Sequence, residues 1–111
     1  MIVDRNGNIT IIAQEKASVK TLVNNIEQAY DDKYKSYHLI VRLSSLEKIS
    51  LEDIIEFLRL SNTHRGDKKS FVIVTSQADL DQMPDELVVV PTLQEAYDII
   101  EMEDIERDLG F

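Results

Sequence analysis

Hydrophobic residues in this chain follow two alternating patterns, short continuous runs and repeats at helical spacing. The continuous runs occupy residues 38–43, 70–75 and 87–90. Such runs are typical of strands that are buried on both faces of a sheet. Elsewhere, apolar residues recur three and four positions apart, which indicates amphipathic helices. These helical positions are Val19, Leu22, Val23, Ile26 and Tyr30, then Leu51, Ile54, Ile55 and Leu58, then Leu93, Ala96, Tyr97 and Ile100.

The start of the chain carries the signal of a β-hairpin. Asn6 and Gly7 both tolerate positive φ, and they separate residues 1–5 from residues 8–14. The second of these segments is rich in isoleucine, a β-branched residue that favours strands. The sequence therefore predicts an N-terminal hairpin with its turn at Asn6-Gly7.

The order of the predicted elements is β-β-α-β-α-β-α-β-α. Strands that alternate with helices need parallel crossover connections, so the pattern predicts an α/β fold. We expect a mixed, mostly parallel central sheet flanked by helices, with a short helix over residues 77–82. One domain fills residues 1–100. Residues 101–111 form either an acidic-hydrophobic tail or an extension of the last helix, in which Ile105 and Leu109 would continue the packed face.

The second predicted helix begins at Ser50. This serine can accept a hydrogen bond from the first helical turn while Asp53 accepts one in return, as in a capping box. Leu51 and Ile55 belong to the apolar face of this helix, and Phe57 widens that face. The pattern therefore predicts that Leu51 and Ile55 point into the core.

Both histidines have structural explanations. His64 and Arg65 lie in the last turn of the second helix, where positive charge suits the helix dipole, and Gly66 can close that helix. We expect a charge pair at the helix end rather than a catalytic pair. His38 opens a strand without an obvious acidic partner, so a structural or exposed position is expected.

Composition narrows the function classes. The 111 residues include 12 Lys and Arg against 21 Asp and Glu, a net charge of −9. That charge repels phosphate backbones, so a protein or a cationic ligand is the expected partner rather than nucleic acid. The absence of cysteine excludes disulfides, thiol catalysis and thiolate metal sites. No signal peptide and no apolar run of membrane-spanning length are visible, so a cytoplasmic protein is expected.

No motif for a cofactor or a metal stands out. The chain has neither a Gly-x-x-x-x-Gly-Lys phosphate loop nor a Gly-x-Gly-x-x-Gly turn. Asp79, Asp81, Asp85 and Glu86 could offer carboxylates to a hard cation, but their spacing matches no known loop. An acidic short helix is the preferred interpretation, and we expect no cofactor and no metal.

Residues 39–53 resemble one small α/β family, the anti-sigma-factor antagonist or STAS domains. The resemblance lies in a buried strand, a polar loop at residues 44–49 and a capped helix from Ser50. In phospho-switched members the helix starts with Asp-Ser-Ser/Thr-Gly, and the matching stretch here is Ser50-Leu51-Glu52-Asp53. The phosphate-accepting position therefore corresponds to Leu51, which cannot be phosphorylated. A shift of one residue would place Ser50 or Glu52 there. The resemblance thus implies the docking surface without the family's switch.

A closer resemblance involves residues 90–96 and 101–111. These segments are similar to small uncharacterised bacterial proteins that are sometimes labelled as ribonuclease Z, the tRNA 3′-processing nuclease. That nuclease family needs a His-x-His-x-Asp-His metal motif, and this chain has only His38 and His64. The residues therefore do not favour nuclease activity.

The resulting hypothesis is a non-catalytic, STAS-like protein-interaction module with a regulatory role. It would dock an unknown protein, or a second copy of itself, through residues 44–53 and through an acidic-hydrophobic tail. The alternatives are a phospho-regulated anti-sigma-factor antagonist and a small hydrolase or ribonuclease Z-related factor. The expected partner-binding residues are Ser44, Ser45, Glu47, Lys48, Ser50, Glu52, Asp53, Leu109 and Phe111.

Overall fold

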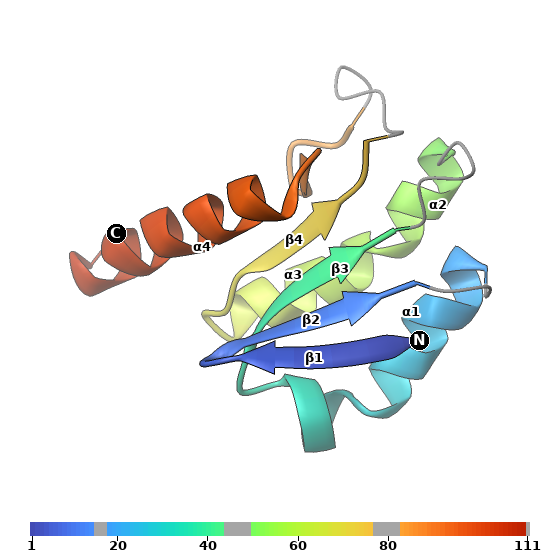
Figure 1. Ribbon diagram of the computed structural model, residues 1–111, viewed down its shortest axis with the longest axis horizontal. Coiled ribbons are helices and arrows are strands. Elements are labelled where there is room, and N and C mark those ends of the chain that lie inside the picture. Colours follow the sequence, from blue (N-terminus) through green and yellow to red (C-terminus); the bar gives the residue numbers. More distant parts are fainter. Residues whose placement is uncertain (15–17, 44–49, 77–82, 111) are drawn as a thin grey trace.

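A five-stranded sheet forms the centre of the molecule (Figure 1). The computed structural model describes residues 1–14, 18–43, 50–76 and 83–110, so the helix predicted over residues 77–82 lies outside the described part. The strands stand in sequence order, with β1 antiparallel to β2 and the other pairs parallel. This confirms the predicted α/β fold with a mixed, mostly parallel sheet. The strands are β1 (Ile2–Asn6), β2 (Ile9–Ala13), β3 (His38–Arg42), β4 (Phe71–Val74) and β5 (Val88–Val90).

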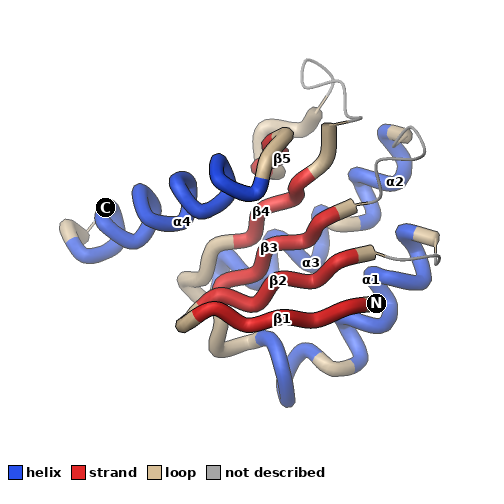
Figure 2. Tube along the Cα trace, in the orientation of Figure 1, coloured by secondary structure: helices blue, strands red, loops and turns tan. Residues whose placement is uncertain are grey.

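Helices cover the two faces of the sheet unequally. Among the described residues, one face packs against α1, α2 and α3, and α4 is the helix that packs on the other face (Figures 1 and 2). A single π-helical turn also follows the first helix. The helices are α1 (Val19–Gln28), the π-helical turn η1 (Tyr30–Tyr34), α2 (Leu51–Glu56), α3 (Leu58–Gly66) and α4 (Leu93–Asp108). Within the described residues, none of them is both long enough and apolar enough to cross a membrane.

The two central strands explain the continuous apolar runs. Leu39 and Val41 of β3 point towards α1, α2 and α3, whereas Ile40 points towards α4. Residues 71–74 of β4 alternate in the same way, and all four are buried. Because both faces are covered, these strands need an apolar residue at every position.

The hairpin forms, but its turn is displaced by one residue from the prediction. Asn6 pairs with Ile9 in the antiparallel register, so Gly7 and Asn8 are the turn residues. Gly7 has a φ of 61°, in the left-handed region where glycine carries no steric penalty. The Asn6-Gly7 turn was therefore wrong by one position, because Gly7 takes the first turn position and Asn6 remains in the strand.

The predicted second helix is divided at Phe57 into α2 and α3. The Phe57 amide hydrogen-bonds to the Ile54 carbonyl, a tightened turn, and the Phe57 side chain is fully buried. Ile54 is also buried, but Leu51 and Ile55 are 43% and 47% exposed. The prediction that Leu51 and Ile55 face the core is therefore wrong. The buried face instead continues from Ile54 and Phe57 to Leu60, Ser61 and His64.

The last helix continues well beyond residue 100. Thr92 caps α4 by accepting a hydrogen bond from the Glu95 amide at 3.2 Å. The helix ends at Asp108, so the acidic residues from 101 onward are largely helical. Ile105 and Leu109 are 55% and 67% exposed, so they do not continue the packed face as the helix-extension alternative expected.

The division at Phe57 predicts that substituting two adjacent isoleucines will change the stability of the protein by very different amounts. Ile54→Ala should lower the free energy of unfolding by about 2–5 kcal/mol, because it opens a cavity among fully buried side chains. Ile55→Ala should change that free energy by less than about 0.5 kcal/mol, because the side chain is half exposed. Urea denaturation of both variants tests this, and equal losses would mean that both residues face the core.

Candidate functional site

The start of α2 has the geometry of a capping box. The Ser50 hydroxyl accepts a hydrogen bond from the Asp53 amide at 3.1 Å, and the Asp53 carboxylate accepts one from the Ser50 amide at 3.4 Å. Two backbone donors that would otherwise lack partners are satisfied in this way. The predicted cap is confirmed, and the Ser50 hydroxyl is used in holding the helix.

The surface of α2 is both apolar and acidic. Leu51 and Ile55 are one helical turn apart and exposed, and Glu52 and Glu56 are exposed beside them. No ion pair joins either carboxylate to another described residue. An exposed apolar pair of this kind has a cost in water that contact with another molecule would remove. We call these four residues, Leu51, Glu52, Ile55 and Glu56, the α2 patch.

Several predicted binding residues cannot be compared with the structure. Ser44, Ser45, Glu47, Lys48 and Phe111 lie outside the described residues. Their assignment stays a prediction. Of the remaining predicted residues, Ser50, Glu52 and Asp53 come together at the start of α2, while Leu109 lies at the end of α4.

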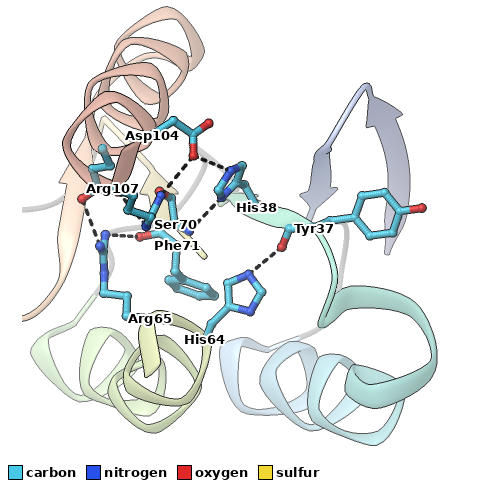
Figure 3. Close-up of polar contacts among 9 residues, drawn as sticks. Tyr37, His38, His64, Arg65, Ser70, Phe71, Asp104 and Arg107 are labelled. Atoms are coloured by element: carbon cyan, nitrogen blue, oxygen red, sulfur yellow. Dashed lines mark hydrogen bonds and ion pairs between the residues drawn. The ribbon is translucent and has the colours of Figure 1, made fainter. Parts of the chain in front are cut away.

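A second polar cluster, which the sequence did not reveal, lies at the opposite edge of the sheet (Figure 3). His38 opens β3 and is buried, and its Nε2 lies 3.0 Å from Oδ1 of Asp104 on α4. Its Nδ1 accepts a hydrogen bond from the Ser70 amide at 2.9 Å. Because Nδ1 is an acceptor, neutral His38 carries its hydrogen on Nε2 and donates it to Asp104. The expectation that His38 has no acidic partner is therefore wrong.

Two arginines extend this cluster. Arg107 donates to the Ser70 hydroxyl at 3.0 Å and to Asp104 at 3.2 Å. Arg65 of α3 donates to Glu103 and to the Phe71 carbonyl, both at 3.0 Å. These bonds join α4 to α3 and to the starts of β3 and β4. We call the cluster the α4 anchor; its members are His38, Arg65, Ser70, Glu103, Asp104 and Arg107.

The hydrogen bonds of the α4 anchor are those of a structural cluster rather than of a catalytic one. Both ring nitrogens of His38 are occupied, one by Asp104 and the other by a backbone amide. The Ser70 side chain is fully buried and its hydroxyl accepts from Arg107, so it faces no open surface. A nucleophile needs a free base beside it and access for a substrate. Here the cluster attaches one helix to the sheet.

A sequence signal for the α4 anchor existed in the helical repeat. Ala96 and Ile100 are the buried apolar residues of α4. Glu103 and Arg107 follow at the same three- and four-residue spacing, so they lie on the same face of the helix. Charged residues on the buried side of a helix indicate paired charges. The sequence does not reveal the partners of the anchor's α4 residues on other elements, which lie 37 to 66 positions away in the chain.

His64 occupies the core and is not part of a charge pair at the helix end. Its Nε2 lies 2.7 Å from the Tyr37 carbonyl, and its Nδ1 lies 2.7 Å from the Tyr30 hydroxyl. Burial lowers the pKa of His64 to about 4. The prediction of a His64–Arg65 charge pair is therefore wrong, because α3 turns His64 inward and leaves Arg65 to the α4 anchor.

Tyr30 joins His64 to an acidic residue. Its hydroxyl also donates to Asp67 at 2.9 Å. When His64 is neutral, its ring hydrogen is on Nε2, which donates to the Tyr37 carbonyl. Nδ1 of His64 is then an acceptor, so the single hydroxyl hydrogen of Tyr30 is shared between Nδ1 and the Asp67 carboxylate. Burial and then the hydrogen bond to Asp67 raise the pKa of Tyr30, so the hydroxyl keeps its hydrogen.

Within the described residues, no group of three or more His, Asp or Glu side chains is placed so that it could hold a metal ion. Asp79 and Asp81, two of the four carboxylates considered from the sequence, lie outside the described part of the chain.

Comparison with known proteins yields a likeness in fold. No protein-family model matches the chain, and no curated protein is significantly similar to it. A solved structure from a study of the molecular architecture of the stressosome, called there a signal integration and transduction hub, is similar in fold. The likeness covers 90% of this chain and 96% of that one, with a TM-score of 0.56 and 16% sequence identity. The chain has a STAS-like fold.

The fold predicted from the resemblance of residues 39–53 is thus confirmed. At this level of identity the likeness concerns the arrangement of strands and helices. The narrower resemblance to proteins labelled ribonuclease Z stays a prediction, as do the binding residues. The site is therefore argued from its own geometry.

The buried histidines predict that the protein loses stability in mild acid. Unfolded His64 binds a proton near its ordinary pKa of 6.5, whereas folded His64 binds one only near 4. The stability from neutral His64 is complete above pH 6.5 and falls by about 3 kcal/mol as the pH drops to 4. Burial lowers the pKa of His38 as well, which adds to the loss. Urea denaturation between pH 7 and 4 should show a steeper decline for the parent than for His64→Gln. Parallel declines would contradict this assignment.

The α4 anchor predicts different costs for two aspartates of one helix. Asp104→Ala should lower the free energy of unfolding by about 1–3 kcal/mol, because it leaves the buried Nε2–H of His38 without an acceptor. Asp108→Ala should change it by less than about 0.5 kcal/mol, because that side chain is exposed. Thermal and urea unfolding measure both. A negligible cost at Asp104 would mean that water replaces its carboxylate at His38.

Proposed function

We propose that this protein is a non-catalytic, regulatory interaction module that docks a partner protein through the α2 patch and the adjoining residues 44–50. The observation that carries this proposal is the exposure of Leu51 and Ile55 on α2, beside the carboxylates of Glu52 and Glu56. The α2 patch adjoins the carboxyl ends of the parallel strands, the edge where open α/β sheets usually place their sites. The module is expected to act in the cytoplasm.

The chemistry of the α2 patch indicates what kind of partner suits it. Two aliphatic side chains one turn apart supply apolar area, and their burial favours association by about 25 cal/mol for each square ångström removed from water. Glu52 and Glu56 flank this pair and complement a cationic rim. A partner surface with an apolar pocket bordered by Lys or Arg therefore fits best.

The likeness to a stressosome structure supports an interaction role in a limited way. That structure comes from a study of the molecular architecture of the stressosome, described as a signal integration and transduction hub. The present chain is similar to it in fold, and the function is carried over only as part of this proposal. An unknown protein partner is favoured over a nucleic acid, since the chain carries a net charge of −9.

The phosphorylation switch is the less favoured alternative. The Ser50 hydroxyl already caps α2, and a phosphate there would stand beside Glu52 and Asp53. Like charges at that distance oppose the modification, although a helix start favours anions in general. A hydrolase or nuclease is also disfavoured, because both histidines are engaged in buried bonds.

The first step of the test is to identify the protein that binds the unsubstituted chain. Affinity purification from cells of the native organism, followed by mass spectrometry, should identify one protein recovered in near-stoichiometric amount. That protein is then purified and its dissociation constant is measured. Leu51→Ser combined with Ile55→Ser should weaken binding by about 2–4 kcal/mol, as truncation of central interface residues does, with little change in melting temperature.

A matched control is available on β1. Ile2 and Val3 are also exposed, at 50% and 39%, and they lie on the edge strand of the sheet. Ile2→Thr combined with Val3→Thr keeps β-branched residues there and should leave the dissociation constant unchanged. If the α2 variant binds as tightly as the parent, α2 is not the docking surface.

A further inference from the structure

A groove lies between α4 and the start of β2, at the edge of the sheet opposite the α2 patch. Its volume is about 360 Å³, and Ile9, Tyr97, Ile100 and Ile105 supply its apolar lining. Ile100 is buried at the base, and Ile9 and Tyr97 are partly buried. Asn6 donates a weak 3.4 Å hydrogen bond to the Tyr97 hydroxyl, which links the hairpin to α4. The groove is thus built from two fixed elements of the fold.

One wall of the groove is acidic. Glu101, Asp104 and Asp108 lie along it on α4, at three- and four-residue spacing. Asp104 is paired with His38 and Arg107, as described above. Glu101 and Asp108 are exposed, and neither forms an ion pair with another residue of the described ranges. Two negative charges therefore face an apolar floor without a cation to balance them.

The apolar surface continues past the groove along α4. Met102, Ile105 and Leu109 are 50%, 55% and 67% exposed, and their spacing places them in one stripe on the outward side of the helix. From Tyr97 to Asp108 the helix rises by roughly 16 Å, at 1.5 Å per residue. An occupant of this length is a peptide segment rather than a small molecule.

Charge decides which peptide fits. A second copy of this chain would bring a net charge of −9 to an acidic wall, so self-association through the groove is opposed. A segment with apolar residues on one side and Lys or Arg on the other satisfies both features. Its apolar side would cover Ile9, Ile100 and Ile105, and its cations would pair with Glu101 and Asp108.

We propose that the groove between α4 and β2 binds a basic amphipathic segment of a partner protein. This inference rests on the proposed function as an interaction module but uses a different surface. The groove would form a second contact, at the opposite edge of the sheet from the α2 patch. A partner could then engage both edges, or two partners could bind at once.

The test uses a defined probe and two charge-matched variants. The probe is a fluorescein-labelled synthetic helix of about 18 residues, built from Leu and Lys so that one side is apolar and the other cationic. The groove variant is Glu101→Lys with Asp108→Lys. The control is Asp31→Lys with Asp32→Lys, two exposed residues of η1 on the sheet face opposite α4, which changes the net charge by the same amount. Fluorescence anisotropy at about 50 mM and about 300 mM salt gives the dissociation constants.

The parent should bind the probe in the micromolar range, more weakly at the higher salt. The groove variant should weaken binding by about tenfold or more, because two attractive contacts become repulsive. The η1 control should weaken it by less than about threefold, the effect of net charge alone. In NMR spectra of the labelled protein, the probe should shift the amide signals of Asn8, Ile9 and residues 97–108, and leave those of residues 30–34 in η1 in place.

Three results would overturn the inference. One is the absence of binding by the parent, and another is equal weakening by both variants, which would mean attraction by net charge only. The third is a dimer of the parent in sedimentation that the groove variant abolishes, because a second copy would then occupy the groove. None of these affects the α2 test, since that test measures a natural partner with Leu51 and Ile55 altered. A failure of the groove is thus distinct from a failure of the proposed function.

Discussion

Among the described residues, α4 is the one helix that packs on its face of the five-stranded sheet, and much of the structure depends on how it does so. The first half of α4 is held by apolar packing through Ala96 and Ile100. Its second half has no apolar residue on the sheet side and is held by the α4 anchor instead. Apolar contact is non-directional, whereas charged hydrogen bonds have defined distances and angles. The anchor therefore sets the direction in which α4 leaves the sheet, and with it the position of the groove beside β2.

The two edges of the sheet consequently have different roles. The edge at the starts of β3 and β4 contains the hydrogen-bonded polar groups of the α4 anchor, and His38 serves there as a bridge between a backbone amide and Asp104. The edge at the ends of these strands carries the start of α2 with its exposed leucine and isoleucine. Buried histidines that stay neutral stabilise a fold near neutral pH and make it sensitive to acid. The polar groups at the first edge thus stabilise the fold, whereas the second edge exposes apolar side chains.

Acidic residues beside exposed apolar side chains recur on α2 and on α4. In both places the carboxylates keep the surface soluble while the aliphatic groups remain available for contact. The two surfaces lie at opposite edges, so they can be altered separately by substitution.

Local patterns were sufficient for the order of the elements, the mixed sheet, the hairpin and the caps at Ser50 and Thr92, because each depends on residues within a few positions of one another. The same patterns failed where distant residues compete. Leu51 and Ile55 have the spacing of a core face, yet Phe57 and His64 fill that space and turn the two aliphatic side chains outward. The partners of His38, the path of α4 and the groove beside Ile9 all depend on contacts between segments far apart in the chain. Such contacts form only when the helices pack on the sheet. Helix faces with similar apolar patterns in the sequence acquire different neighbours at that stage.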